Sequence, residues 1–303
     1  MSYPSSVKIV EVGPRDGLQN EKTTVGLQTK LTLVQQLADA GLVHIEAGSF
    51  VSPKWVPQMA GSDNLFEEIN RSIAPVFPDV QYSALTPNER GLDRAIECGV
   101  REVAVFAAAS EQFSQKNINC SIAESLHRFV PVLKKAQQAN IRVRGYVSCV
   151  LGCPYQGPVS THQVAEVTKA LLDMGCYEVS LGDTIGVGTP ASTEVLLDSL
   201  LTSVPVEQLA LHMHDTYGKA LANVLIGLQM GISVIDSAVS GLGGCPYAKG
   251  ASGNLATEDL VYMLNGLGIN HGIDMNKLLL AGRTISMKID RPVGSKVAQV
   301  SQI

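Results

Sequence analysis

The 303-residue sequence lacks the features that mark several classes of protein. It has no long apolar run that could span a membrane, and no basic run of the kind that binds nucleic acid. The first residues, Met1-Ser2-Tyr3-Pro4, lead into an apolar segment without a signal peptide or an Arg-rich leader. The last three residues are not a peroxisomal signal. We therefore expect a cytoplasmic protein that binds neither nucleic acid nor membranes, although a processed organellar enzyme would look similar.

Cysteine is scarce, and its spacing suggests no disulfide framework. A chain of this length folds without covalent cross-links, so we expect reduced thiols. Cys149 and Cys153 are four positions apart, which fits neither a redox C-x-x-C motif nor a zinc site, and we interpret them as ordinary structural thiols. The net charge is −5 and 45% of the residues are hydrophobic, so a large core can be buried. The six cysteines are Cys98, Cys120, Cys149, Cys153, Cys176 and Cys245.

Short apolar runs alternate with helical patterns along the chain. The predicted strands are Val7–Val12, Val43–Ala47, Gln81–Leu85, Glu102–Ala107, Arg142–Cys149, Glu178–Leu181, Gln208–Met213 and Val234–Ala238. The predicted helices between them include Gly26–Ala40, Glu89–Cys98, Ile122–Ala139, Thr161–Met174, Pro190–Ser203 and Gly218–Met230. Several helices end in a glycine just before the next strand, as at Gly41 and Gly175, where φ can be positive.

Eight strands joined by helical crossovers predict one parallel sheet. Such a sheet is either a doubly wound open sheet or a closed (β/α)₈ barrel, the TIM barrel. Repeated strand–helix units without a G-x-G-x-x-G motif after the first strand favour the barrel. We expect a single domain over 1–303, with the barrel at about 7–240, a glycine-rich loop at 241–254 and additional C-terminal helices in 255–303. Those helices are predicted near Leu255–Gly266 and Met275–Ile289.

Barrels of this kind carry their reacting groups at the carboxyl ends of the strands, and polar residues stand there in this sequence. His212 and His214 are two apart in the seventh strand, so they face the same side and could hold one metal ion. Asp16 after the first strand and Asn254 beyond the eighth would add oxygen ligands. This set suits Mn²⁺, Mg²⁺, Fe²⁺ or Zn²⁺. The alternative is a hydrogen-bonded histidine pair without a metal.

Four further residues are candidates for chemistry. Arg15 is either half of a structural salt bridge or a fixed guanidinium that stabilises an enolate or orients a carboxylate. Cys245 lies among the five glycines of the 241–254 loop, and is either an incidental thiol or a reactive one. Glu46 ends the predicted second strand, and Asp183 lies at the end of the sixth.

Three segments carry a family resemblance. They are the opening segment Val7–Lys22, which includes Gly13-Pro14-Arg15-Asp16-Gly17, then Ser49–Met59, and the loop Ser240–Asn254. They resemble 3-hydroxy-3-methylglutaryl-CoA lyases, and the similarity covers nearly the whole chain. The Arg-Asp start and the H-x-H pair are shared by a wider superfamily of metal-dependent barrel lyases and synthases. The Gly-Leu-Gly-Gly-Cys-Pro-Tyr-Ala-Lys-Gly loop is much narrower.

The resemblance implies a site, a reaction and a setting. The implied ligands of a divalent metal, Mg²⁺ or Mn²⁺, are Asp16, His212, His214 and Asn254. The implied catalytic residues are Arg15, Glu46, Asp183 and Cys245. The implied reaction is cleavage of an acyl-CoA, 3-hydroxy-3-methylglutaryl-CoA, to acetyl-CoA and acetoacetate in leucine degradation. Either His212 or a water held by Asp183 is the base for the C3 hydroxyl. We also expect a homodimer or higher homo-oligomer.

Two rival interpretations remain at this point. A synthase or aldolase of the same superfamily, condensing acetyl-CoA with a 2-oxo acid, would share Arg15, Asp16 and the two histidines but need not have the Cys245 loop. A non-catalytic acyl-CoA-binding barrel is the more distant rival, and it would have no need of both the ligands and the thiol. The chain also lacks the leader and the Cys-containing C-terminal tail of organellar members, which bears on location rather than chemistry.

Overall fold

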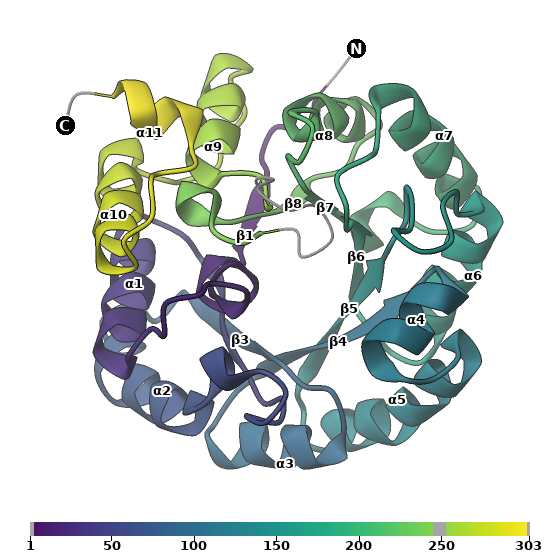
Figure 1. Cartoon of the computed structure of the whole chain (residues 1–303), viewed down its shortest axis with the longest axis horizontal. Helices are drawn as coiled ribbons and strands as arrows, with labels where there is room; N and C mark the ends of the chain where they lie inside the picture. Colours follow the sequence, from purple (N-terminus) through teal and green to yellow (C-terminus); the bar gives the residue numbers. More distant parts are fainter. Residues whose placement is uncertain (1–2, 245–252, 302–303) are drawn as a thin grey trace.

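Eight parallel strands close into a barrel in chain order, which confirms the predicted fold (Figure 1). The computed structural model describes residues 3–244 and 253–301. The strands are β1 (Lys8–Glu11), β2 (His44–Ser49), β3 (Gln81–Leu85), β4 (Glu102–Ala108), β5 (Arg142–Ser148), β6 (Glu178–Asp183), β7 (Leu209–Met213) and β8 (Val234–Ser237). Closure comes from the pairing of β1 with β8, in which Lys8 lies opposite Val234.

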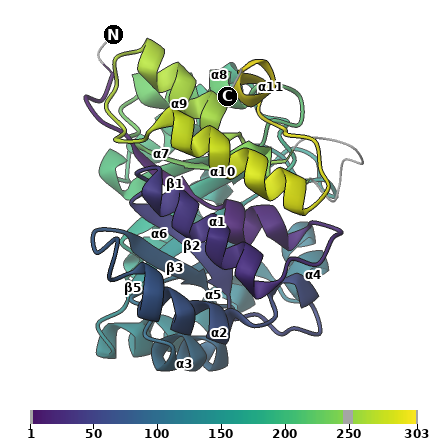
Figure 2. The same cartoon turned by 90° about the vertical axis from the view of Figure 1, so that its left-hand side faces the viewer.

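Helices surround the barrel on its outer side (Figure 1). They are α1 (Leu27–Asp39), α2 (Ser62–Glu68), α3 (Glu89–Glu97), α4 (Glu111–Ile118), α5 (Ile122–Gln138), α6 (Thr161–Asp173), α7 (Pro190–Leu201), α8 (Ala220–Gln229), α9 (Thr257–Gly266), α10 (Met275–Lys288) and α11 (Lys296–Val300). The short helices α2, α4 and α11 were not among the predicted elements. Helix α10 lies beside α1 (Figure 2), so the C-terminal helices cover the β1 side of the barrel. None of the described helices is long and apolar enough to cross a membrane.

The strands have apolar outer faces and a charged interior. On β4, Val103 and Val105 belong to the main hydrophobic core, which packs the strands against the helices. The interior instead holds the buried side chains of Arg144, Glu178 and Asp236, where barrels of this class more often place branched apolar residues. These buried charged side chains depart from the usual apolar filling of a barrel, and they lie beneath the candidate site described below.

The second strand corrects one expectation. Glu46 does not end β2, because the strand continues to Ser49. A register shift between Glu46 and Gly48 allows this, since it adds one residue against β3 before pairing resumes at Ala84. Glu46 is therefore held within the barrel rather than in the loop that follows the strand.

Two buried glutamates fix the connection that follows β8. Glu11 accepts hydrogen bonds from the backbone N–H groups of Gly13 (2.8 Å) and Val239 (2.9 Å). Glu258 accepts from the backbone of Ser240, a residue with the unusual φ of 57°. Burial raises the pKa of Glu11 to about 7 and that of Glu258 to about 8. Both side chains therefore retain a proton in the folded protein at a pH where the unfolded chain has lost it.

Glu258→Gln should reduce the pH dependence of stability. The folded protein holds the Glu258 proton up to about pH 8, whereas an unfolded glutamate releases it near pH 4.5. The wild-type free energy of unfolding should therefore fall as pH rises between these values, by at most about 1.4 kcal/mol per pH unit from this group. The glutamine variant should lose that part of the slope in urea denaturation. The exposed control Glu194→Gln should keep it, and a Glu258→Gln slope equal to wild type would contradict the assignment.

Candidate active site

A single π-helical turn after β1, Gly13–Gly17, carries Arg15 and Asp16. The Glu11 carboxyl group fixes the start of this turn, because its Oε1 accepts a hydrogen bond from the Gly13 backbone. At its end, a Cβ added to Gly17 would lie 2.7 Å from the Cβ of Leu242, so only glycine allows the turn to pack against the segment after β8. The conformation of the turn is thus fixed by contacts with β1, through Glu11, and with the segment after β8, through Leu242.

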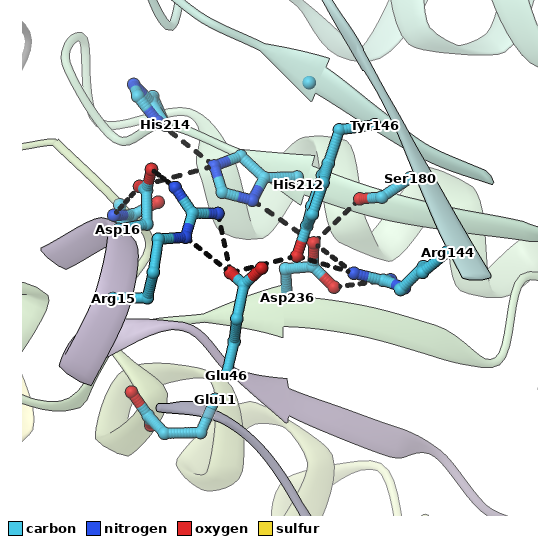
Figure 3. Close-up of polar contacts among 12 residues, drawn as sticks. Glu11, Arg15, Asp16, Glu46, Arg144, Tyr146, Ser180, His212, His214 and Asp236 are labelled. Atoms are coloured by element: carbon cyan, nitrogen blue, oxygen red, sulfur yellow. Dashed lines mark hydrogen bonds and ion pairs between the residues drawn. The ribbon is translucent and has the colours of Figure 1, made fainter. Parts of the chain in front are cut away.

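Arg15 is buried and held by two carboxylates (Figure 3). Its Nε and Nη2 atoms lie 2.7 and 2.6 Å from Oε2 of Glu46, and its Nη1 lies 2.7 Å from Oδ1 of Asp16. The guanidinium carbon lies 5.6 Å from the centre of the Tyr146 ring. Burial opposes the charge, but Glu46 and Asp16 outweigh it and raise the pKa of Arg15. Arg15 is therefore both a salt-bridge partner and a permanently charged group at the barrel mouth.

Asp16, His212 and His214 converge at the carboxyl end of the barrel (Figure 3). One ligand atom from each of the three lies within 4.8 Å of the others. The two Nε2 atoms of the histidines are 3.3 Å apart, and Nε2 of His212 is 4.0 Å from Oδ2 of Asp16. His214 directly follows β7 and forms an isolated bridge with Asn254. The three predicted ligands that come from β1 and β7 are thus brought together.

The donor atoms of this cluster suit a divalent cation. Nδ1 of His212 lies 3.2 Å from Oδ2 of Asp236; although burial opposes it, this contact and Asp16 raise the pKa of His212. In the neutral ring the proton is on Nδ1, and the Nε2 lone pair is directed at His214 and Asp16. Burial and the neighbouring His212 lower the pKa of His214 to about 4, which keeps that imidazole neutral. Burial opposes ionisation of Asp16, but the adjacent Arg15 guanidinium, together with the hydrogen bond from Asn254, outweighs it and lowers the Asp16 pKa to about 2. Two lone pairs and a carboxylate therefore face one point.

Asn254 lies at the edge of this cluster. Its side-chain nitrogen donates to Oδ2 of Asp16 at 2.8 Å and to the Leu242 carbonyl at 3.2 Å. A Cβ added to Gly243, whose φ is 105°, would lie 2.8 Å from that nitrogen. The two described ends of the glycine-rich loop therefore meet beside Asp16. Cys245, the predicted thiol of this loop, lies outside the described residues.

Glu46 and Asp183 are both buried carboxylates with one oxygen left over. Oε2 of Glu46 accepts hydrogen bonds from Arg15, while its Oε1 has no hydrogen-bond partner among the described residues. Oδ2 of Asp183 accepts from the Gly188 backbone at 2.8 Å, while its Oδ1 likewise lacks a partner there. Burial raises the pKa of Asp183 to about 6. Asp183 can therefore exchange a proton near neutral pH.

The sequence predictions missed a buried layer beneath the cluster. Asp236 on β8 accepts from both terminal nitrogens of Arg144 (3.1 and 2.8 Å) and from the hydroxyl of Ser180 (2.7 Å). Tyr146 accepts from Arg144 and donates to Glu46. The available signal was a charged residue within an apolar strand, as in Val234-Ile235-Asp236-Ser237. This layer orients the groups above it.

The fold and the site together define an enzyme of the (β/α)₈-barrel class with a candidate metal centre on its carboxyl face. The HMGL-like family model matches residues 6–285. The mitochondrial hydroxymethylglutaryl-CoA lyase of Bos taurus is 60% identical over 300 residues, which cover 99% of this chain and 91% of that protein. The chain belongs to the hydroxymethylglutaryl-CoA lyase family and is a carbon–carbon lyase.

Solved structures agree with this assignment. The crystal structure of hydroxymethylglutaryl-CoA lyase from Pseudomonas aeruginosa is 58% identical and has a TM-score of 0.95, with 99% of this chain and 98% of that chain covered. An HMG-CoA lyase from Acinetobacter baumannii, solved in complex with coenzyme A and 3-methylmalate, is 35% identical with a TM-score of 0.92. That match covers 100% of this chain and 97% of the other.

Asp236→Asn should weaken the binding of a divalent cation. Asparagine cannot hold the His212 Nδ1 proton as a carboxylate does, so the Nε2 lone pair becomes a poorer and less well oriented donor. We expect the Mn²⁺ affinity, measured by titration calorimetry, to fall by about 10- to 100-fold.

Ser180→Ala is the matched control for this variant. It removes another hydrogen bond to the same Asp236 oxygen but leaves the His212 contact intact. Its Mn²⁺ affinity should stay close to wild type. A folded Asp236→Asn protein with unchanged affinity would show that the carboxylate does not position His212.

Proposed function

We propose that this enzyme cleaves 3-hydroxy-3-methylglutaryl-CoA to acetyl-CoA and acetoacetate with the help of a divalent cation. The convergence of Asp16, His212 and His214 beside a buried arginine is the observation that carries the proposal. The names of its relatives support the same substrate. The complex of one relative with coenzyme A supports an acyl-CoA ligand.

The cation would be held by Asp16, His212 and His214, with Asn254 beside them. When bound, such an ion polarises the C3 hydroxyl and carboxylate oxygens of the substrate and makes the hydroxyl more acidic. The mixture of nitrogen and oxygen donors is compatible with Mn²⁺ or Mg²⁺, which are the ions we propose.

Asp183 is the base that we favour for the C3 hydroxyl, acting directly or through a water. His212 is the weaker alternative, because one ring nitrogen faces Asp236 and the other is needed for the cation. Asp183 has a carboxylate oxygen without a hydrogen-bond partner among the described residues and a pKa of about 6, so it is ionised at neutral pH yet can accept a proton. Its oxygen then takes the hydroxyl proton as the C2–C3 bond breaks and the C3 carbonyl of acetoacetate forms.

Arg15 stabilises the enolate that this cleavage leaves on the thioester. A guanidinium has five N–H donors, and three of them are engaged by Glu46 and Asp16. One N–H on each terminal nitrogen remains for the enolate oxygen, in a buried position where such contacts are strong. Glu46 holds the fork in place, and we assign it this positioning role.

Cys245 is the proposed acid that returns a proton to the enolate carbon and completes acetyl-CoA. It directly follows Gly244, and the described ends of its loop meet beside Asp16. The reaction consumes no net proton, because the hydroxyl loses one and the carbon gains one. We further propose a cytoplasmic homo-oligomer, a homodimer or larger, that serves leucine degradation.

Incubation of the purified protein with the proposed substrate and Mg²⁺ tests the function. Mass spectrometry should detect acetyl-CoA and acetoacetate in equal amounts, and exhaustive chelation should abolish their formation until Mn²⁺ or Mg²⁺ is restored. Turnover by protein verified to be free of metal would show that the reaction does not need a divalent cation. Binding of the substrate without formation of products would refute the lyase activity. So would a protein that leaves this substrate intact but condenses acetyl-CoA with a 2-oxo acid in a parallel incubation.

Arg15→Gln should lower kcat by about 10³-fold, the effect of losing a strong donor to a developing oxyanion. KM should change much less, because this contact matters chiefly in the transition state. Steady-state kinetics on protein shown to be folded by circular dichroism measures both, with the exposed Arg71→Gln as control. A near-normal kcat with a greatly raised KM would instead make Arg15 a clamp for bound substrate.

Cys245→Ala should lose most activity while retaining Mn²⁺ and acyl-CoA binding, because a methyl group cannot donate a proton. Cys245→Ser should also be poor, since a hydroxyl is a far weaker acid than a thiol. Alkylation of Cys245 in the wild-type protein should inactivate the enzyme, and a bound substrate analogue should protect Cys245 from alkylation. Turnover of Cys245→Ala near the wild-type rate would rule out the proton-donor role.

A further inference from the structure

Cys149 and Cys153 form a second thiol centre that the proposed reaction does not use. They lie in the turn after β5, where they pack with Ala108 and Phe113 in a small apolar cluster separate from the main core. Cys149 is fully buried. Cys153 differs, because polar groups surround its sulfur.

The sulfur of Cys153 sits in a cradle of hydrogen-bond donors. The backbone N–H groups of Tyr155 and Gln156 point at it from 3.4 and 3.3 Å, and the hydroxyl of Ser110 lies 2.9 Å away. The Ser110 hydroxyl shares its hydrogen with Oε1 of Gln156 at 3.0 Å. Several donors directed at one sulfur favour the thiolate over the thiol.

The two sulfurs therefore differ in character. Burial opposes the thiolate of Cys153, but the hydrogen bonds from Ser110, Tyr155, Gln156 and Cys149 outweigh it, and its pKa is lowered. Burial, together with the neighbouring Cys153, raises the pKa of Cys149, which remains a thiol. A nucleophilic thiolate beside a protonated thiol is the arrangement in which one cysteine reacts with an oxidant and the other resolves the product.

Cys153 is buried beneath a turn that is itself partly exposed. Its residue is 3% exposed, and the next residues in the turn, Tyr155 and Gln156, are exposed. A molecule as small as hydrogen peroxide therefore reaches the sulfur when this turn opens. Cys98 and Cys176 are comparably buried, but no such set of donors surrounds their sulfurs among the described residues, and burial raises their pKa values to about 11 and about 12.

We propose that Cys153 is a site of oxidation by peroxides and that Cys149 resolves it to a disulfide. The Cys153 thiolate attacks one peroxide oxygen, the O–O bond breaks, and the departing hydroxide takes up a proton as water. The thiol of Cys149 then attacks the sulfenic sulfur, an S–S bond forms and a second water leaves. Two thiols are oxidised by two electrons, and one hydrogen peroxide is reduced to two waters.

A single tryptic peptide reports this reaction. Both cysteines fall within Gly145–Lys169, which contains no other cysteine. Native protein is treated with limiting hydrogen peroxide, unfolded, alkylated and digested. The peptide should lose two hydrogen atoms and escape alkylation at doses that leave Cys98, Cys120 and Cys176 reduced, with a rate at least about tenfold above theirs. Oxidation of this peptide no faster than the others would overturn the proposal.

Two variants separate the roles of the residues. Cys149→Ser should leave a sulfenic acid on Cys153 that dimedone captures, whereas wild type should give the disulfide and no dimedone adduct. A wild-type protein that accumulates the adduct with Cys149 still free would refute the resolving role. Because the readout is chemical modification of this peptide, it is independent of the lyase activity and of Cys245.

Ser110→Ala tests the cradle itself and should slow oxidation of Cys153. Ser110 also caps helix α4 through the Phe113 backbone, so loss of the cap needs a control. Ser121→Ala supplies it, since Ser121 caps α5 in the same way through Glu124. The control should oxidise at the wild-type rate. Equal rates in both variants would show that Ser110 does not activate the sulfur.

Discussion

The paired hydrogen bonds between Arg144 and Asp236 are the interaction on which the rest of the site depends. The two side chains join β5 to β8 across the barrel and are almost fully buried. Burying such charges is unfavourable unless each is completely paired. Arg144 also donates to Glu178, and Asp236 accepts from Ser180 and His212, so the pairing is nearly complete. The ionised Asp236 in turn orients the His212 ring. The charged side chains inside the barrel therefore support the cluster of Asp16, His212 and His214 above them.

Tyr146 connects this lower layer to the upper one. Its hydroxyl accepts from Arg144 at 3.0 Å and donates to Glu46 at 3.3 Å, and Glu46 holds Arg15. The ring also packs edge-on against His212. Arginine, tyrosine and carboxylates thus alternate from β8 to the mouth of the barrel (Figure 3). In such a network each group restricts the rotamers of the next, which is how a site gains the preorganisation that electrostatic catalysis needs.

The sequence predicted the fold well because its signals are local. Apolar runs, helix-ending glycines and polar residues after strands each occupy a few consecutive positions, and they located the eight strands, Arg15, Asp16 and the histidine pair. The Arg144–Asp236 pair could not be found in this way, since 92 positions separate its members and only barrel closure brings them together. The register shift after Glu46 and the donors around Cys153 likewise depend on neighbouring strands and turns. Cys245 was identified by family resemblance, and its geometry lies outside the described residues.

Closure of the barrel between its first and last strands also sets the order of events during biosynthesis. Asp16 leaves the ribosome about 200 residues before His212, and β8, which seals the barrel, follows still later. At ordinary translation speeds the growing chain carries Asp16 without its histidine partners for about 10 to 40 seconds. During that time Asp16 is the only member of the three-residue cluster that has been synthesised. The cluster can be completed only after β8 has been synthesised and has paired with β1.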